Sequence, residues 1–487
     1  MTPISCYLVG SDTLLTECGA ILLDQGHDLR GVVTSEQRIR AWCERRGVPV
    51  IEASEDWGRT LHEAEPFDVL FAITHLSIIP AEVLALPRRL AVNFHDGPLP
   101  RYAGLNAPVW ALLNQESEYG ISWHVMTPGV DEGPLLEQVR FPIAPGETAQ
   151  SLNTRCLAEA LGSFPELVAR IAEGREARTP QDLAERKVYR RLDRPAAACL
   201  MDWSSSSAEL DARVRGLSFG PHSNPVGLPK AMVPGRKPFV VDSLDILPEA
   251  SRTGAPGEVL RVREGGIAVA TRDGAVEITA ARCLDGAPLD AEGLRTRHGL
   301  EVGASLVGPG SPLALLLDQA EGEWARYERF WTRRLLAAEP PELPLGTAGA
   351  PVEGRGRVAG LFKEPLSGSS AAVDGISPEW LVAAVAVVLA RLGDKDRFDV
   401  AMRAAADVPG DFYLPWIPVP VSLDPKTSMG GLVSQVERTS VEILGRGSAL
   451  RDLRLRVPGL AEKTRNWPVA VGNLGDVGSD APVLVFD

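Results

Sequence analysis

The sequence predicts an α/β protein whose first domain is built on a doubly wound parallel sheet. Short apolar, β-prone runs alternate with helical runs along the first 190 residues, and this alternation indicates parallel strands joined by crossover helices. No GxGxxG fingerprint follows the first run, so a dinucleotide site is not predicted. A chain of 487 residues exceeds one typical core, and two to four domains are expected.

The expected elements of the first domain follow one another at short intervals. The strands are expected at 4–10, 29–34, 48–51, 68–73 and 89–94, and the helices at 14–25, 36–46 and 149–173. Gly26 ends the first helix, because glycine readily adopts the left-handed conformation of a helix terminus. The last helix is amphipathic and is expected to pack on the sheet.

Beyond residue 200 the chain changes to short β-prone runs separated by prolines and glycines. A short helix is expected near 210–217 and strands at 239–241, 257–261, 266–271 and 275–281. This spacing predicts a small antiparallel β-barrel. The predicted domains are residues 1–190, 200–310 and 316–487.

The third region starts with an aromatic, charged helix at 323–331. A Pro/Gly/Ser-rich linker is expected at 340–370. Ser377 and Pro378 then begin an apolar helix at 381–392, with serine as the N-cap and proline in the first turn. Because the linker is rich in proline and glycine, we expect the attachment of this region to be adjustable.

Charge and composition narrow the function classes. The net charge is −14, and residues 201–310 hold 12 Lys and Arg against 14 Asp and Glu, so binding of nucleic acid is not expected. No apolar run is long enough to span a membrane. No signal peptide is expected, because the first residues lack a basic segment followed by an apolar core. The six cysteines form no CxxC pair, which predicts buried thiols in a reducing cytoplasm and no metal site.

The most informative motif lies at the end of the strand expected at 89–94. Asn93 and His95 stand two positions apart, so on a strand they point to the same side. Two prolines and two glycines in 96–104 make the next segment a loop. Open α/β sheets bind ligands at the carboxyl ends of strands. A lone histidine at such a position is more often structural. Together with Asp131, however, Asn93 and His95 suit acyl transfer, since an amide and an imidazole can stabilise an oxyanion. A carboxylate can orient the other groups or accept a proton.

Three motifs together resemble the 10-formyltetrahydrofolate-dependent formyltransferases over roughly residues 1–310. They are Asn93-x-His95, the Pro98-Leu99-Pro100-x-x-x-Gly104 loop and Val130-Asp131-x-Gly133. The family includes methionyl-tRNA formyltransferase, and the loop is most similar to the formyltransferase domains that begin some nonribosomal peptide synthetases. The resemblance implies an OB-like barrel as the second domain.

The resemblance also implies roles for individual residues. Asn93, His95 and Asp131 would be the catalytic trio, and 10-formyltetrahydrofolate would be the co-substrate. Contacts with the folate are expected from the following residues: Leu76, Ile79, Gly97, Pro98, Leu99, Pro100 and Val130. The wider family usually has Ser-Leu-Leu-Pro where this chain has Gly-Pro-Leu-Pro, so a donor such as a coenzyme A thioester is the alternative.

Three further side chains keep two interpretations each. His124 lies on an alternating strand, where it either touches substrate or lines the pocket wall. Arg101 and Tyr102 either guard the mouth through which the acceptor enters or belong to a solvated loop.

Residues 316–487 resemble a fragment of the α+β condensation domain of nonribosomal peptide synthetases, without the catalytic His-His-x-x-x-Asp-Gly. We therefore expect this region to dock an acceptor-bearing partner or a neighbouring synthetase domain and to catalyse nothing. The leading hypothesis is a formyltransferase acting on an amino group of a small or carrier-bound acceptor in nonribosomal peptide or siderophore biosynthesis. A non-catalytic docking module is the alternative from another class.

Overall fold

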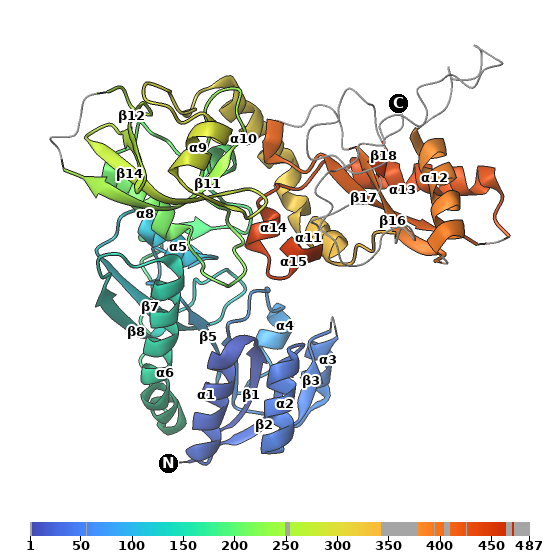
Figure 1. Ribbon diagram of the computed structural model, residues 1–487. Helices are drawn as coiled ribbons and strands as arrows, with labels where there is room; N and C mark the ends of the chain where they lie inside the picture. The colour runs from blue at the N-terminus through green and yellow to red at the C-terminus, as the bar shows by residue number, and fades with distance from the viewer. Residues whose placement is uncertain are drawn as a thin grey trace, which may run out of the picture. The chain divides into compact units, whose positions relative to one another are not determined.

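The computed structural model describes residues 2–54, 56–248, 254–341, 378–393, 395–403, 410–424, 426–463 and 470–471 (Figure 1). The chain divides into unit 1, Met1–Asp193 with Asp211–Gly220, and unit 2, Arg194–Leu210 with Pro221–Asp487. None of the helices in the described ranges has the length and apolar character needed to cross a bilayer. Residues 342–370 of the expected linker and the expected N-cap Ser377 lie outside the described residues.

Unit 1 contains a seven-stranded sheet in the order β3-β2-β1-β4-β5-β7-β8. Its strands are β1 (Ser5–Gly10), β2 (Asp28–Thr34), β3 (Val50–Glu52), β4 (Val69–Ile73), β5 (Leu90–His95), β7 (Glu118–Val125) and β8 (Leu135–Pro142). The first five strands pair in parallel, which confirms the predicted parallel sheet, but β7 and β8 extend it with antiparallel pairs. The short connection between β7 and β8 carries no crossover helix, and only antiparallel strands can be joined in that way.

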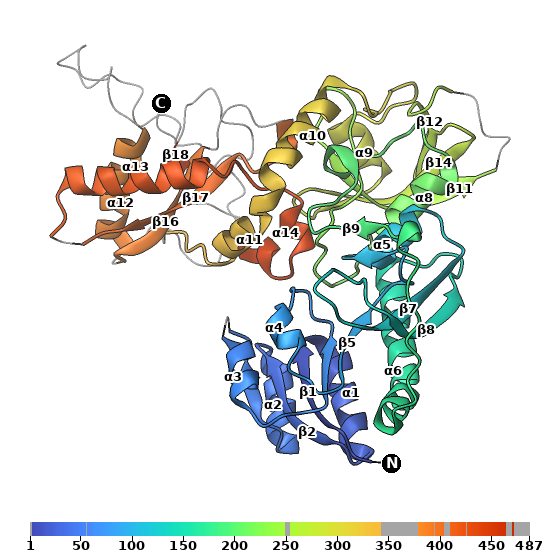
Figure 2. The same cartoon turned by 180° about the vertical axis from the view of Figure 1, so that it is seen from behind.

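Helices cover both faces of this sheet. They are α1 (Asp12–Asp24), α2 (Gln37–Arg46), α3 (Trp57–Glu63), α4 (Ala81–Leu84), α5 (Ala107–Leu113) and α6 (Ala149–Glu173), with a 3-10 turn at Leu183–Glu185. α6 has the predicted bounds and lies beside α1 (Figure 2). Its Phe164 meets Phe71 of β4 edge to face, whereas Leu61 of α3 and Val83 of α4 pack with Tyr7 on the opposite face. A small parallel pair, β6 (Ala103–Gly104) and β9 (Val188–Tyr189), lies apart from the large sheet.

Unit 2 begins with a small β domain. Its strands are β10 (Lys230–Ala231), β11 (Phe239–Leu247), β12 (Val259–Arg263), β13 (Gly266–Ala270), β14 (Ala275–Cys283) and β15 (Pro288–Leu289). Nearby helical segments are α7 (Ala196–Cys199), α8 (Ser207–Gly216), whose residues fall in both units, and α9 (Ala291–His298). All pairings among these strands are antiparallel, as expected, in the order β10-β11-β14-β13-β12 with β15 on β14. The OB-like barrel itself stays a prediction.

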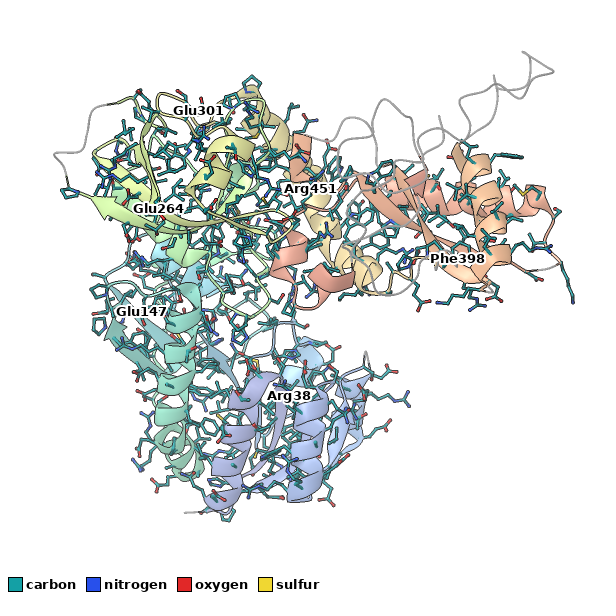
Figure 3. The ribbon with its side chains drawn as sticks, viewed as in Figure 1. Arg38, Glu147, Glu264, Glu301, Phe398 and Arg451 are labelled. Atoms are coloured by element: carbon teal, nitrogen blue, oxygen red, sulfur yellow. The ribbon has the colours of Figure 1, made fainter. Side chains whose placement is uncertain are left out.

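The rest of unit 2 consists of helices and a three-stranded sheet. The elements are α10 (Pro312–Trp324), α11 (Glu328–Leu336), α12 (Pro378–Gly393), β16 (Arg397–Arg403), β17 (Trp416–Ser422), α13 (Met429–Leu444), α14 (Leu453–Arg456), α15 (Leu460–Lys463) and β18 (Ala470–Val471), with 3-10 turns at Ala325–Tyr327 and Gly410–Phe412. The predicted helix at 323–331 is broken by the first of these turns. α12 contains the predicted apolar helix. Phe398 of β16 (Figure 3) lies in one hydrophobic cluster with Val382 of α12 and Val436 of α13. The resemblance of this region to a condensation domain stays a prediction.

A buried network of charges ties this region to the β domain within unit 2. Lys230 of β10 places Nζ 2.5 Å from Asp452 Oδ2, and Arg456 of α14 places Nε 3.1 Å from Asp452 Oδ1. The side chains of these three residues are 0% exposed. Arg456 and Arg194 both pair with Glu328 of α11, at 2.6 and 3.1 Å. We expected the attachment of this region to be adjustable. That expectation is wrong for the segment around Asp452, because Asp452 is paired with Lys230 of β10.

Candidate active site

The site starts at the carboxyl end of β5. Asn93 and His95 lie on one side of the strand, and Phe94 between them packs on Trp123 on the other side, with ring centroids 5.2 Å apart. His95 is 5% exposed. The strand-end position predicted for both side chains is therefore where the structure places them.

The hydrogen bonds of His95 fix the orientation of its ring. Nε2 lies 2.6 Å from the carbonyl oxygen of Tyr102. A carbonyl only accepts, so Nε2 carries a proton and donates it. Nδ1 is left facing two carboxylates, 3.7 Å from Asp131 and 3.9 Å from Asp96. Nδ1 is thus the nitrogen that His95 can offer to a substrate.

The loop after β5 is shaped around this histidine. A Cβ at Gly97 would lie 2.9 Å from both His95 Nε2 and the Tyr102 carbonyl oxygen, so only glycine fits there without displacing that hydrogen bond. The N–H of Leu99 donates to Ser122 Oγ at 3.1 Å, and Gln138 donates to the Leu99 carbonyl at 2.9 Å. The loop is thereby attached to β7 and β8.

Asp131 comes from the β7–β8 connection and adopts an unusual backbone conformation. Its φ is +53°, in the left-handed region that aspartate tolerates better than most residues. The N–H of Gly104 donates to Asp131 Oδ2 at 2.7 Å, and Gln181 Nε2 donates to the Asp131 carbonyl at 2.8 Å. Such local strain persists when surrounding contacts hold it, and it is common at functional sites.

The surroundings of Asp131 favour its charged form. Burial alone would raise the pKa of this carboxyl, but the nearby His95 charge, His124 and the N–H of Gly104 together hold the pKa well below its usual range. Asp131 is therefore a carboxylate at any physiological pH, and a weak base.

His124 of β7 joins the trio directly. The antiparallel pairing places it opposite Asn93, whose Nδ2 lies 3.1 Å from His124 Nε2. His124 Nδ1 donates to the Val125 carbonyl at 3.0 Å, so Nδ1 carries a proton. His124 Nε2 is 3.4 Å from Asp131 Oδ1. The sequence left the role of His124 open. Its position depends on the antiparallel register of β5 and β7, which no local sequence pattern predicts.

Asp96 is a neighbour that the motif analysis did not single out. It follows His95 directly and places Oδ1 3.9 Å from His95 Nδ1. Burial and the charge of Asp131 raise the pKa of Asp96 despite the opposing effect of His95. Two carboxylates with pKa values moved in opposite directions therefore flank one imidazole.

The residues expected to contact the folate fall into two groups. Leu76 and Val130 are 63% and 40% exposed, and Ile78, which was not predicted, is 78% exposed. Ile79, Gly97, Pro98 and Leu99 are buried and Pro100 is partly buried. Exposed apolar side chains at the carboxyl end of β4 suit an aromatic ring system such as a pterin. The individual contacts stay predictions. Within the described ranges, no group of three or more His, Cys, Asp or Glu side chains could hold a metal ion.

An amide and an imidazole at the carboxyl end of β5, beside an ionised carboxylate from the β7–β8 connection, suit the class of enzymes that transfer an acyl group. Sequence comparison identifies the acyl group that is transferred as formyl. The formyl transferase family matches residues 38–168, and the family described as formyl transferase, C-terminal domain, matches residues 195–298.

Similar proteins agree with these matches. A methionyl-tRNA formyltransferase of Phenylobacterium zucineum is 32% identical over 288 residues, covering 58% of this chain and 87% of the relative. One of Sorangium cellulosum is 32% identical over 240 residues, covering 49% and 74%. The chain belongs to the formyltransferase family. It is a formyl-transferring enzyme whose donor is 10-formyltetrahydrofolate. The family matches support neither a coenzyme A thioester as the donor nor the alternative of a docking module without activity.

Solved structures resemble the chain more distantly. An N-formyltransferase of Helicobacter canadensis, in complex with folinic acid and dTDP-3-aminofucose, is 17% identical with a TM-score of 0.47, covering 57% of this chain and 99% of that one. HypX of Aquifex aeolicus, in complex with tetrahydrofolic acid, is 20% identical with a TM-score of 0.43, covering 61% and 48%. Neither likeness bears on the acceptor.

Proposed function

We propose that this enzyme formylates the amino group of a small or carrier-bound acceptor in nonribosomal peptide or siderophore biosynthesis. The observation that supports the proposal is the negative net charge of the chain. The chain has a net charge of −14, and residues 201–310, which correspond to the C-terminal formyltransferase domain, hold more acidic than basic side chains. A tRNA-binding surface needs clustered Lys and Arg to neutralise phosphates.

Methionyl-tRNA is the second candidate acceptor. It is favoured by the relatives, because the proteins at 32% identity are named methionyl-tRNA formyltransferases. Against it stands the charge of this chain. The predicted resemblance of residues 316–487 to a condensation-domain fragment would favour the natural-product role, because such a region would lie beside domains that carry tethered amino acids.

The residues of the site divide the work of transfer. The donor supplies the formyl carbonyl, whose carbon the acceptor amine attacks. Asn93 has a second amide N–H beyond the one that faces His124, and Nδ1 of His95 can donate when the imidazole is protonated, so both can stabilise the oxygen as negative charge develops. Asp131, with its lowered pKa, is a poor proton acceptor and instead stabilises a positive charge on His95. The C–N bond to the acceptor forms first and gives a tetrahedral oxyanion. The C–N bond to the donor nitrogen then breaks, and that nitrogen takes up the proton that the amine loses.

A competition among acceptors tests the proposal. The full-length protein is incubated with 10-formyltetrahydrofolate and, separately, free amino acids, hydroxylated diamines, an aminoacyl carrier protein and methionyl-tRNA, and the products are identified by mass spectrometry. We expect formylation of an amine that is free or carrier-bound. The His95→Ala variant is the control for non-enzymatic transfer. Formylation of methionyl-tRNA alone would overturn the proposed acceptor while leaving the chemistry in place.

A further inference from the structure

Tyr102 supplies the acceptor that holds the catalytic imidazole. Its carbonyl oxygen lies 2.6 Å from His95 Nε2, shorter than an ordinary N–H···O hydrogen bond. This contact decides which nitrogen carries the proton and directs Nδ1 toward Asp131. The orientation of His95 therefore depends on what fixes the backbone of Tyr102.

The side chain of Tyr102 is fixed on its aromatic face. Its ring stacks on that of Tyr189 with centroids 5.7 Å apart, and Tyr189 stacks on Trp110 at 4.8 Å, both at an interplanar angle of 11°. Tyr119 meets the Tyr102 ring edge to face at 5.8 Å. Tyr102 is 3% exposed, so the interpretation of this residue as part of a solvated loop does not hold.

The hydroxyl of Tyr102 is fixed as well. It donates to Glu116 Oε1 at 2.7 Å and accepts from Asn114 Nδ2 at 3.0 Å. Asn114 Nδ2 also donates to the Tyr189 hydroxyl at 2.9 Å, which couples the two stacked rings. Burial, reinforced by the bond to Glu116, raises the pKa of Tyr102, so this hydroxyl remains a donor throughout the physiological range.

The same short segment holds the second catalytic group. Gly104, two residues after Tyr102, donates its N–H to Asp131 at 2.7 Å, and pairs with Tyr189 in the β6–β9 pair. A displacement of residues 102–104 would therefore move the partners of His95 and Asp131 together. Gly104 has φ of +95° and a Cβ there would lie 2.0 Å from the Tyr189 carbonyl oxygen, so the segment has little freedom to adjust.

We propose that Tyr102 is a positioning residue for His95, anchored by Glu116, Asn114 and Tyr189. Tyr102 touches no reacting atom in this scheme and acts through the hydrogen bond to Nε2. The inference rests on formyl transfer but is independent of which amine is the acceptor. A pocket of about 300 Å³ adjoins the anchoring hydroxyls and is also lined by Arg101 and Lys187. Water can therefore replace a deleted hydroxyl without collapse of the surrounding structure.

The test removes the anchor while keeping the ring. In Tyr102→Phe, we expect kcat to fall roughly tenfold or more, because misplacing a catalytic group by about 1 Å can cost on the order of 10²-fold. The KM for 10-formyltetrahydrofolate should stay within about twofold, since Tyr102 is not among the residues expected to contact the donor. Glu116→Ala should reproduce the loss, whereas Glu116→Gln, which still offers an oxygen to the hydroxyl, should restore most of the rate.

A spectroscopic measurement separates positioning from packing. The ¹⁵N signals of the His95 ring are recorded on the full-length, histidine-labelled protein between about pH 5 and pH 8, where imidazoles change protonation. The signals are assigned by their loss in His95→Asn. We expect the wild type to show a protonated Nε2 and Tyr102→Phe to show mixed or broadened tautomers. Tyr7→Phe removes a hydroxyl from another buried tyrosine of unit 1 and should change neither readout.

Unchanged His95 signals in a folded Tyr102→Phe protein would overturn the proposal, whether or not the rate falls. Full activity in both Tyr102→Phe and Glu116→Ala would overturn it too. If Tyr102→Phe does not fold, Asn114→Ala takes its place, because Asn114 is exposed and its loss removes the amide that joins the hydroxyls of Tyr102 and Tyr189. A product assay that finds no formylated amine leaves the ¹⁵N result valid, so failure of the acceptor proposal and failure of this one are distinguishable.

Discussion

Asp131 in unit 1 and Asp452 in unit 2 both have a pKa held well below the usual range, yet their surroundings differ. The Asp131 side chain is 13% exposed, its charged partners are imidazoles, and its backbone is strained. Asp452 is fully buried between Lys230 and Arg456. Burial would raise the pKa of Asp452, but the charges of Arg456 and Lys230 outweigh it.

The difference shows that a shifted pKa alone does not identify an active site. Structural ion pairs perturb pKa values as strongly as catalytic ones do. What separates the two clusters is the partners. Imidazoles change protonation near neutral pH, whereas Lys and Arg stay charged, so the Asp131 cluster can move protons and the Asp452 cluster can only hold segments together.

The largest effect expected is from truncation. A chain ending at residue 310 loses Asp452, Arg456 and Glu328, and leaves the Lys230 ammonium buried with only the carbonyls of Ala198 and Leu228 as acceptors. An unpaired buried charge is strongly destabilising. We expect the shortened protein to lose cooperative unfolding of unit 2, measured by calorimetry.

Lys230→Met in the shortened chain is the matched test, because it removes the stranded charge and should recover part of the stability. A shortened protein that melts within a few degrees of the full-length one would show that the network contributes little, and would restore the picture of a detachable C-terminal region.

The next effect concerns the catalytic trio. We expect Asn93→Ala to lower kcat by about 10²–10³-fold, as loss of an oxyanion donor does, and His95→Ala and Asp131→Ala by about 10²–10⁴-fold. Their free energies of unfolding should change by less than the roughly 3–5 kcal/mol expected for a broken buried ion pair, because these groups lie at a strand end and in a loop. Steady-state kinetics and denaturant unfolding measure the two quantities. Near-normal turnover in any two variants would disprove the site.

Asp452→Ala should give the opposite pattern. Breaking a buried ion pair by removing one partner costs about 3–5 kcal/mol, and here it leaves Lys230 without its carboxylate. The kcat of the folded fraction should stay within about twofold, since this cluster holds no group that titrates near neutrality. Glu437→Ala, on the exposed face of α13, should change stability by at most about 0.5 kcal/mol. A fall in kcat without a fall in stability would give Asp452 a catalytic role.

The sequence was sufficient to predict where Asn93, His95 and Asp131 lie, because each of them obeys a local rule. Asn93 and His95 end an apolar run, and glycines and prolines mark the loops around them. Their meeting at one edge follows from the topology of the sheet. The position of His124 depends on an antiparallel register that no local pattern encodes. The pairing of Lys230 with Asp452 joins distant segments, and neither residue has a neighbour in sequence that predicts its burial.

The smallest effect that we expect is a difference between Asp131→Asn and Asp452→Asn in how their stability depends on pH. Both folded-state pKa values are depressed, so each carboxylate stabilises the fold above the unfolded value of about 3.9, and this stability is lost as pH falls through the folded value. Below about pH 4, therefore, the stability difference between wild type and either variant should shrink.

Above neutrality the two should diverge. The charged partners of Asp131 are imidazoles, a type of group that loses its charge in the neutral range, so the advantage of wild type over Asp131→Asn should decline as pH rises through that range. The advantage over Asp452→Asn should stay constant to about pH 9, because its partners are Lys and Arg. Thermal unfolding across this range measures both. Parallel curves for the two variants would mean that Asp131 is stabilised mainly by fixed donors such as the Gly104 N–H, and that its charge is not coupled to the protonation of His95.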